Sequence, residues 1–196
     1  MSKKIAILAL QGDYEEHTLA IEKSGAVPVL VRTPEQIESI DGLILPGGES
    51  TVIGMLAQEY KLLDPLRDVI QNNLPVLATC AGLILLAKKV HSQKQGGQIL
   101  IGGLDIVVDR NFKGSQINSF ETNITARQVS TTPIKAMFIR PPQILRAGGS
   151  VDTLATYDFG KGEEPVLVQQ RNLIGASFHT ELGASHSLHK YFLSLT

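Results

Sequence analysis

The first half of the chain alternates short apolar runs with segments of helical periodicity. Apolar runs lie at residues 4–10, 27–32, 42–48 and 75–79, and helical patterns follow them at 15–25, 34–40, 50–60, 64–73 and 81–90. Parallel strands need crossover connections, which helices usually supply, so this order predicts a parallel sheet. We therefore predict an α/β fold of three layers: a flavodoxin-like, open, mostly parallel sheet with helices on both faces.

From about residue 99 the pattern changes to short strand-like runs separated by Gly, Pro and Asn. These runs lie at 99–110, 120–126, 135–141, 153–159, 164–172 and 173–179, and a last helical pattern follows at 184–195. They predict a mixed or antiparallel extension of the sheet. Since no repeat, low-complexity segment or linker interrupts the chain, we expect residues 1–196 to form one domain.

Charge and cysteine content narrow the range of partners. The chain has 18 basic and 19 acidic residues, a net charge of -1, and no long run of like charge. This balance argues against binding to nucleic acid, and no apolar stretch is long enough to span a membrane. The single cysteine excludes an internal disulfide and a multi-thiolate zinc site, and no signal-peptide pattern is visible. We expect a cytoplasmic protein that binds a small molecule or another protein.

The single cysteine, Cys80, lies in LATCAGL (77–83), where a predicted strand gives way to a helix. In open α/β sheets, ligands bind at the carboxyl ends of strands. The small neighbours Ala78 and Gly82 fit a sharp strand-turn-helix that exposes a nucleophile at a helix N-terminus, where the thiolate is favoured. The alternative is an ordinary buried cysteine that acts as a small hydrophobe.

A thiol nucleophile requires a base and a group that orients the base. In SFHTE (177–181), His179 ends another predicted strand and Glu181 follows two residues later. In an extended backbone the two side chains leave on the same side, so the carboxylate can hold one imidazole nitrogen while the other faces the thiol.

The other four histidines have simpler interpretations. We expect His17 and His91 to be solvated or packed surface residues. His186 and His189 are three residues apart on the last predicted helix, a spacing that could suit a metal, but no cysteine or carboxylate nearby completes a ligand set. We therefore expect no metal site.

A glycine pair, Gly47 and Gly48, lies at another predicted strand end in LPGGEST (45–51). Glycines let backbone amides approach a ligand closely, which suits an anion site or an oxyanion hole. A glycine turn before a helix capped by Ser50 would explain the same residues. A phosphate-binding loop is disfavoured because its lysine is absent.

Together these motifs resemble a known family. The segments LALQGDYEEH, GGEST, TCAGLILLA, RNFKGSQINSFE, FIRPP and SFHTEL occur in the order found in the glutaminase subunits of two-protein pyridoxal 5'-phosphate synthases. TCAGL and SFHxE alone indicate the wider class I glutamine amidotransferases, and the first and fourth segments narrow the resemblance. It implies hydrolysis of L-glutamine without a cofactor. It also implies ammonia transfer through a tunnel to a barrel-shaped synthase subunit, in a hetero-oligomer with many copies of each.

The resemblance also implies roles for particular residues. Cys80 would be the nucleophile, His179 the general acid and base, and Glu181 the residue that orients the imidazole. The remaining matched positions would bind glutamine or its oxyanion. The glutamine-binding positions are Gly47, Gly48, Glu49, Arg110, Ile139 and Arg140, and the oxyanion donors are the amides of Gly48 and Ala81.

Three positions depart from the family pattern: Ala78 replaces a glycine, Thr180 a proline and Ser115 an arginine. None of them removes a group from the triad. Two other functions stay open at this point. One is the glutaminase of a different amidotransferase, such as that of histidine biosynthesis, and the other is a non-enzymatic docking module. We also expect the Gly47–Gly48 peptide to act as a gate that partner binding switches.

Overall fold

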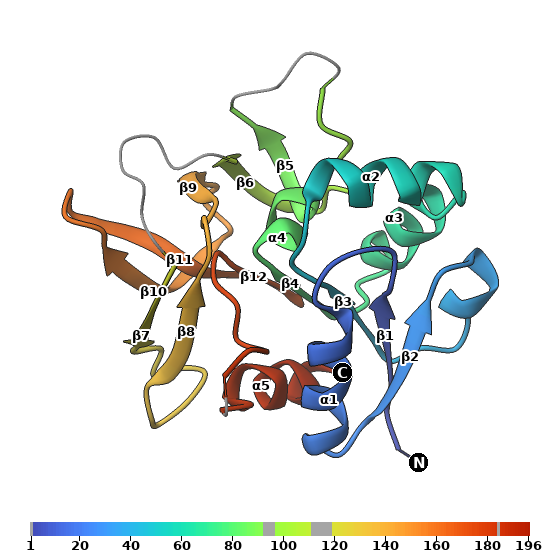
Figure 1. Ribbon diagram of the computed structural model, residues 1–196, viewed down its shortest axis with the longest axis horizontal. Helices are drawn as coiled ribbons and strands as arrows, with labels where there is room; N and C mark the ends of the chain where they lie inside the picture. Colours follow the sequence, from blue (N-terminus) through green and yellow to red (C-terminus); the bar gives the residue numbers. More distant parts are fainter. Residues whose placement is uncertain (1, 92–96, 111–118, 184) are drawn as a thin grey trace.

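A seven-stranded sheet runs through the centre of the protein (Figure 1), in the strand order β10-β11-β12-β4-β3-β1-β2. The computed structural model describes residues 2–91, 97–110, 119–183 and 185–196. Five strands run parallel: β1 (Lys4–Leu8), β2 (Val27–Val31), β3 (Gly42–Leu45), β4 (Val76–Thr79) and β12 (Leu173–Ala176). Their order, 2-1-3-4-12, confirms the predicted flavodoxin-like sheet.

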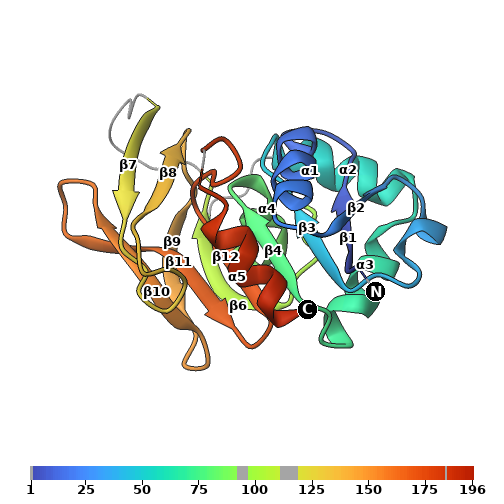
Figure 2. The ribbon, with the colours of Figure 1, turned by 90° about the horizontal axis from the view of Figure 1, so that it is seen from below.

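Helices cover both faces of this sheet, as predicted. One face carries α1 (Tyr14–Lys23) and α5 (Ser187–Leu195), and the other carries α2 (Ser50–Glu59), α3 (Leu63–Gln71) and α4 (Ala81–Leu86) (Figures 1 and 2). The 3-10 helix η1 (Pro34–Ile37) follows β2.

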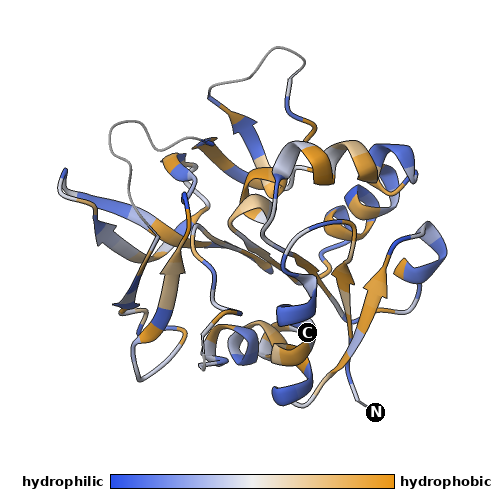
Figure 3. Cartoon of the chain, viewed as in Figure 1, coloured by the Kyte–Doolittle hydropathy of each residue, from blue (hydrophilic) through white to orange (hydrophobic). Residues whose placement is uncertain are grey.

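Side-chain alternation along the strands explains why both faces need covering. In β1, Ala6 and Leu8 join the core under α2, α3 and α4, whereas Ile5 and Ile7 join the core under α1 and α5. Strands buried on both sides are apolar throughout, which is why they appear in the sequence as unbroken runs. Figure 3 shows these central strands as hydrophobic, with hydrophilic residues on the helices around them.

The predicted mixed extension is also present. Strands β10 (Asp152–Asp158) and β11 (Glu163–Gln170) continue the main sheet in antiparallel fashion. A second sheet contains β5 (Ala87–Val90), β6 (Leu104–Asp109) and β9 (Gln143–Ala147), and a third pairs β7 (Phe120–Ile124) with β8 (Ile134–Phe138). Among the described residues, no helix has the length and apolar character that crossing a membrane requires.

Several predicted boundaries are wrong. The helix expected over 81–90 ends at Leu86, because residues 87–90 pair in parallel with β6 as strand β5. The segment 34–40 contains a single 3-10 turn, and the strand expected from residue 99 begins at 104, after two glycines with positive φ. Strand β9 was not predicted. The last helix begins at Ser187 and not at residue 184, which lies outside the described residues. Residues 87–90 and 143–147 form strands β5 and β9 because they pair with β6. The local sequence pattern does not indicate such pairing between distant segments.

A close contact between β3 and α4 depends on Gly82. A Cβ atom added at this glycine would collide with the carbonyl oxygen of Leu45 and would also lie against the Leu45 side chain. The helix that follows Cys80 therefore packs backbone-to-backbone on the sheet, which only glycine permits.

We predict that Gly82→Ala lowers the free energy of unfolding by roughly 2–3 kcal/mol, because the helix must move away from a well-packed core. Chemical denaturation measures this loss. The matched control is Gly149→Ala, where an added Cβ meets no atom within 4 Å; its unfolding free energy should not fall. Equal losses in both variants would contradict the proposed contact.

Candidate active site

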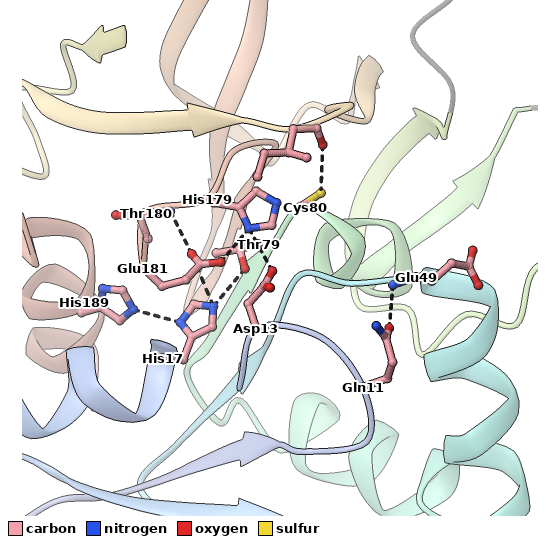
Figure 4. A network of polar contacts seen from close by, with 11 residues as sticks. Gln11, Asp13, His17, Glu49, Thr79, Cys80, His179, Thr180, Glu181 and His189 are labelled. Atoms are coloured by element: carbon pink, nitrogen blue, oxygen red, sulfur yellow. Dashed lines mark hydrogen bonds and ion pairs between the residues drawn. The ribbon is translucent and has the colours of Figure 1, made fainter. Parts of the chain in front are cut away.

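The parallel strands end at one edge of the sheet, and β3, β4 and β12 are each followed by predicted site residues; Arg110 follows β6, and Ile139 and Arg140 follow β8. The register pairs Thr79 of β4 with Ala176 of β12, so Cys80 and the segment leading to His179 leave the sheet side by side. A cavity of about 500 Å³ opens there. Its lining includes Gly48, Glu49, Cys80, Ala81, Arg110, Ile139, Arg140 and His179. Gly47 packs against the His179 ring, and Glu181 lies behind that ring (Figure 4).

Cys80 occupies the sharp turn that the sequence predicts. Its backbone has φ 46° and ψ −104°, in the left-handed half of conformational space, and its N–H donates to the Ala176 carbonyl at 2.9 Å. A non-glycine residue adopts such a conformation only where its surroundings hold it there, and such residues gather at functional sites. The side chain is 8% exposed, at the base of the cavity, and Sγ lies 3.9 Å from the Ile139 carbonyl oxygen.

His179 is fixed from both its backbone and its ring. Its backbone N–H and C=O pair with Met137, next to the end of β8, at 2.8 and 3.0 Å. Its Nδ1 lies 2.7 Å from Glu181 Oε1, as the two-residue spacing predicts, and its side chain also hydrogen-bonds with Cys80. The structure therefore brings Cys80, His179 and Glu181 together in the order that a thiol, a base and an orienting carboxylate require.

The charges around His179 favour its protonated form. Burial alone would lower the pKa of His179, but hydrogen bonds with Asp13, Cys80 and Glu181 raise it to about 12. Burial would raise the pKa of Glu181, but interactions with His17 and His179 lower it to about 2. The site therefore holds an ionised carboxylate beside an imidazolium that contacts Cys80.

Two site residues were missed by the sequence reasoning. Asp13, in the loop after β1 and immediately before α1, places Oδ2 at 3.2 Å from His179 Nδ1 and lines the cavity. Gln11 accepts a hydrogen bond from the Glu49 N–H through Oε1 at 2.7 Å (Figure 4). Both follow a parallel strand at its carboxyl end, a position that could have identified them.

The expectation for His17 was wrong. This residue is fully buried, with Nε2 at 3.1 Å from Thr79 Oγ1 and 3.5 Å from Glu181 Oε2. Its Nδ1 faces His189 Nε2 at 3.0 Å, so this nitrogen of His189 points into the core toward α1. His91 is exposed, as expected.

Thr180 supplies a hydrogen bond that the family's usual proline lacks. Its N–H donates to Glu181 Oε2 at 2.8 Å, and the residue is completely buried. Threonine here therefore adds a donor to the carboxylate and does not loosen its placement. Ala78 is also fully buried, within the core under α4. Ser115 lies outside the described residues.

An arginine and a glutamate form an ion pair in the lining of the cavity. Arg110 Nη2 donates to Glu49 Oε1 at 2.8 Å, while Glu49 Oε2 accepts the Val52 N–H and caps α2. Arg110 Nη1 is buried and has no hydrogen-bond partner among the residues that the structure describes. A guanidinium with a free buried N–H favours a carboxylate ligand.

The Gly47–Gly48 peptide lies between the cavity and the segment after β1. The Gly47 carbonyl accepts the Asp13 N–H at 3.2 Å, and Gly48 has φ +146°. Because C=O and N–H point in opposite directions across a trans peptide, the Gly48 N–H points away from the Asp13 N–H.

With this geometry established, comparisons with known proteins identify the family. Residues 7–196 match the model of the SNO glutamine amidotransferase family. The chain belongs to this family. This finding confirms the resemblance drawn from the motifs.

Relatives of the SNO family member described here agree closely over its whole length. A protein of Thermotoga maritima called pyridoxal 5'-phosphate synthase subunit PdxT is 45% identical over 192 residues, which cover 98% of each chain. A Frankia alni protein of the same description is 45% identical, over 98% of this chain and 94% of that relative. A crystal structure described as a glutamine amidotransferase superposes with a TM-score of 0.89 at 39% identity, covering 97% of both chains. PurLQS from Thermotoga maritima, at 15% identity and a TM-score of 0.72, shares the fold.

We predict that Thr180→Pro lowers the turnover number for glutamine hydrolysis by a few-fold, because Glu181 Oε2 loses the N–H at 2.8 Å. Thr180→Ala keeps this N–H and is the matched control, with turnover close to wild type. Steady-state glutamate release measures both. Equal activity of the proline and alanine variants would show that this hydrogen bond does not support the site.

Proposed function

We propose that this SNO family member hydrolyses L-glutamine to L-glutamate and ammonia, with Cys80 as the nucleophile. The observation that carries the proposal is the chain of contacts from Cys80 to His179 to Glu181 beneath the cavity. A docking surface needs none of these groups. A strained cysteine turn beside a charged, oriented histidine is the arrangement of a thiol hydrolase.

The reaction would proceed through a thioester. The Cys80 thiolate attacks the carboxamide carbon, and the negative charge moves to the carbonyl oxygen. The amides of Gly48 and Ala81 would stabilise this oxyanion, a contribution on the order of a hundredfold per donor. His179 gives its proton to the departing nitrogen as ammonia leaves. The imidazole, now neutral, takes a proton from water, and the resulting hydroxide attacks the γ-glutamyl thioester. The C–S bond breaks, glutamate leaves, and the Cys80 thiolate is regenerated beside the imidazolium.

The amino-acid end of glutamine would bind at the opposite side of the cavity. Glutamine carries an α-carboxylate and an α-ammonium group, and Arg110 and Glu49 offer the opposite charges. The Arg110 Nη1 group, buried without a described partner, supports a role in binding the carboxylate. Ile139 and Arg140 line the same cavity. Arg140 has a positive φ of 45°, so the backbone turns sharply at this residue.

We further propose that the ammonia passes to a separate synthase subunit that makes pyridoxal 5'-phosphate. The names of relatives at about 45% identity over nearly the full chain support this assignment. The competing assignment, to another amidotransferase such as that of histidine biosynthesis, is not the description that these relatives carry. The complex would contain both subunits in many copies, and this chain would act without a cofactor of its own.

We predict that Cys80→Ala abolishes glutamate release while the melting temperature stays near that of wild type.

Glu181→Gln should lower turnover severely and leave the KM for glutamine almost unchanged, because orienting His179 matters chiefly in the transition state. Glutamate release by the Cys80→Ala and Glu181→Gln variants is measured with the synthase subunit present. A Cys80→Ala protein that still hydrolyses glutamine at the wild-type rate would refute the mechanism.

We also predict that ammonia release rises steeply as the synthase subunit is titrated in. Partner binding would favour the orientation in which the Gly48 N–H faces the cavity, and about 3 kcal/mol raises a poorly populated orientation a hundredfold. Gly48→Ala should reduce the rise more than it weakens docking. If the chain alone already matches the saturated complex, this peptide is not a gate.

A further inference from the structure

A second histidine lies on the side of Glu181 opposite His179. His17, on α1, is completely buried, and its Nε2 is 3.5 Å from Glu181 Oε2 and 3.1 Å from Thr79 Oγ1 (Figure 4). Its other nitrogen, Nδ1, is 3.0 Å from Nε2 of His189 on α5. The mechanism above uses neither of these histidines.

The positions of these nitrogens determine where the protons lie. A hydrogen bond between two imidazoles needs one N–H and one lone pair. If His17 carried its proton on Nδ1, the lone pair of Nε2 would face the ionised Glu181 carboxylate, which is repulsive. With the proton on Nε2, His17 can donate to Glu181 or Thr79 and accept from the His189 Nε2–H. The His189 Nδ1 is then a lone pair, which agrees with its having no hydrogen-bond partner within the described ranges.

Both histidines are neutral in this arrangement. Burial, together with the charge of His179, lowers the pKa of His17 despite the opposing attraction of Glu181, Asp13 and Glu16. Burial and the neighbouring His17 and His186 lower the pKa of His189 to about 3, against the attraction of Glu181. The carboxylate therefore has a neutral imidazole nitrogen 3.5 Å away on this side, without a second positive charge that would compete with His179 for it.

We propose that His17 is a positioning residue for the catalytic triad: its Nε2–H holds Glu181 Oε2, and His189 fixes the tautomer that makes this possible. The line of contacts then runs from His189 through His17, Glu181 and His179 to Cys80, and it joins helices α5 and α1 to the end of β4. The inference rests on the proposed function, because it concerns the triad's carboxylate.

The arrangement explains how Glu181 keeps one orientation. Its Oε1 is engaged by His179 at 2.7 Å, and its Oε2 by the Thr180 N–H at 2.8 Å and by His17 at 3.5 Å. Without His17, Oε2 retains one donor and the carboxylate is free to rotate. The imidazole that it orients would then lose its alignment with the thiol, a loss felt in turnover more than in glutamine binding.

The tautomer can be measured directly, independently of any activity. In ¹⁵N NMR spectra of histidine-labelled protein at neutral pH, we expect Nε2 protonated and Nδ1 unprotonated for both His17 and His189. The His17→Gln and His189→Gln variants assign the signals. A His17 whose Nε2 is unprotonated, or which is a cation at neutral pH, would overturn the proposal even if glutamine hydrolysis were never detected.

Kinetics test the positioning role in the complex with the synthase subunit. We expect His17→Leu to lower turnover at least about tenfold with KM changed less than about twofold, and His17→Gln, which keeps an N–H donor, to recover most of the loss. The control is Ile21→Ala, a fully buried residue of the same helix outside the contact line; it should lose stability but not turnover. If His17→Leu and Ile21→Ala have equal turnover, His17 is only structural. If the wild-type complex does not hydrolyse glutamine, the proposed function fails while the NMR result still decides the tautomer.

Discussion

The parallel pairing of β4 with β12 is the constraint on which the site depends. It aligns Thr79 with Ala176 and lets the Ala176 carbonyl hold the Cys80 N–H at 2.9 Å. The two strands are almost a hundred residues apart in sequence, yet their carboxyl ends deliver the thiol and the imidazole to the same point. The strained Cys80 turn persists because this pairing and the close packing of Gly82 on Leu45 hold it from both sides.

A second constraint is electrostatic. The site buries an ionised carboxylate, and burial of such a charge is costly unless hydrogen bonds and an opposite charge compensate it. The His179 ring and the Thr180 backbone N–H hydrogen-bond the carboxylate here, and the His17 ring lies 3.5 Å from Oε2 on a third side. The same contacts fix the geometry of the triad. The contacts that stabilise the buried Glu181 charge therefore also align the His179 imidazole.

The sequence predicts the parallel core and the triad well, for a physical reason. Strands buried on both faces leave unbroken apolar runs, and a cysteine or histidine directly after such a run marks the ligand edge of the sheet. The spacing of His179 and Glu181 is local, so extended geometry alone predicts their contact. By contrast, His17 sits in the polar YEEHT segment of α1, and nothing local indicates that α5 would cover it. Strands β5 and β9 were missed for the same reason, because their partners are distant in sequence.

The central claim is that Cys80 becomes covalently linked to glutamine during turnover, and mass spectrometry tests this most directly. The chain, with the synthase subunit present, would be mixed with glutamine, quenched in acid within the turnover time and digested. We predict that the peptide containing Cys80 gains the mass of one γ-glutamyl group, and that hydroxylamine removes it, as expected for a thioester. The gain should be absent from Cys80→Ala. Steady glutamine hydrolysis with no adduct on that peptide, or with an adduct on another residue, would contradict the account.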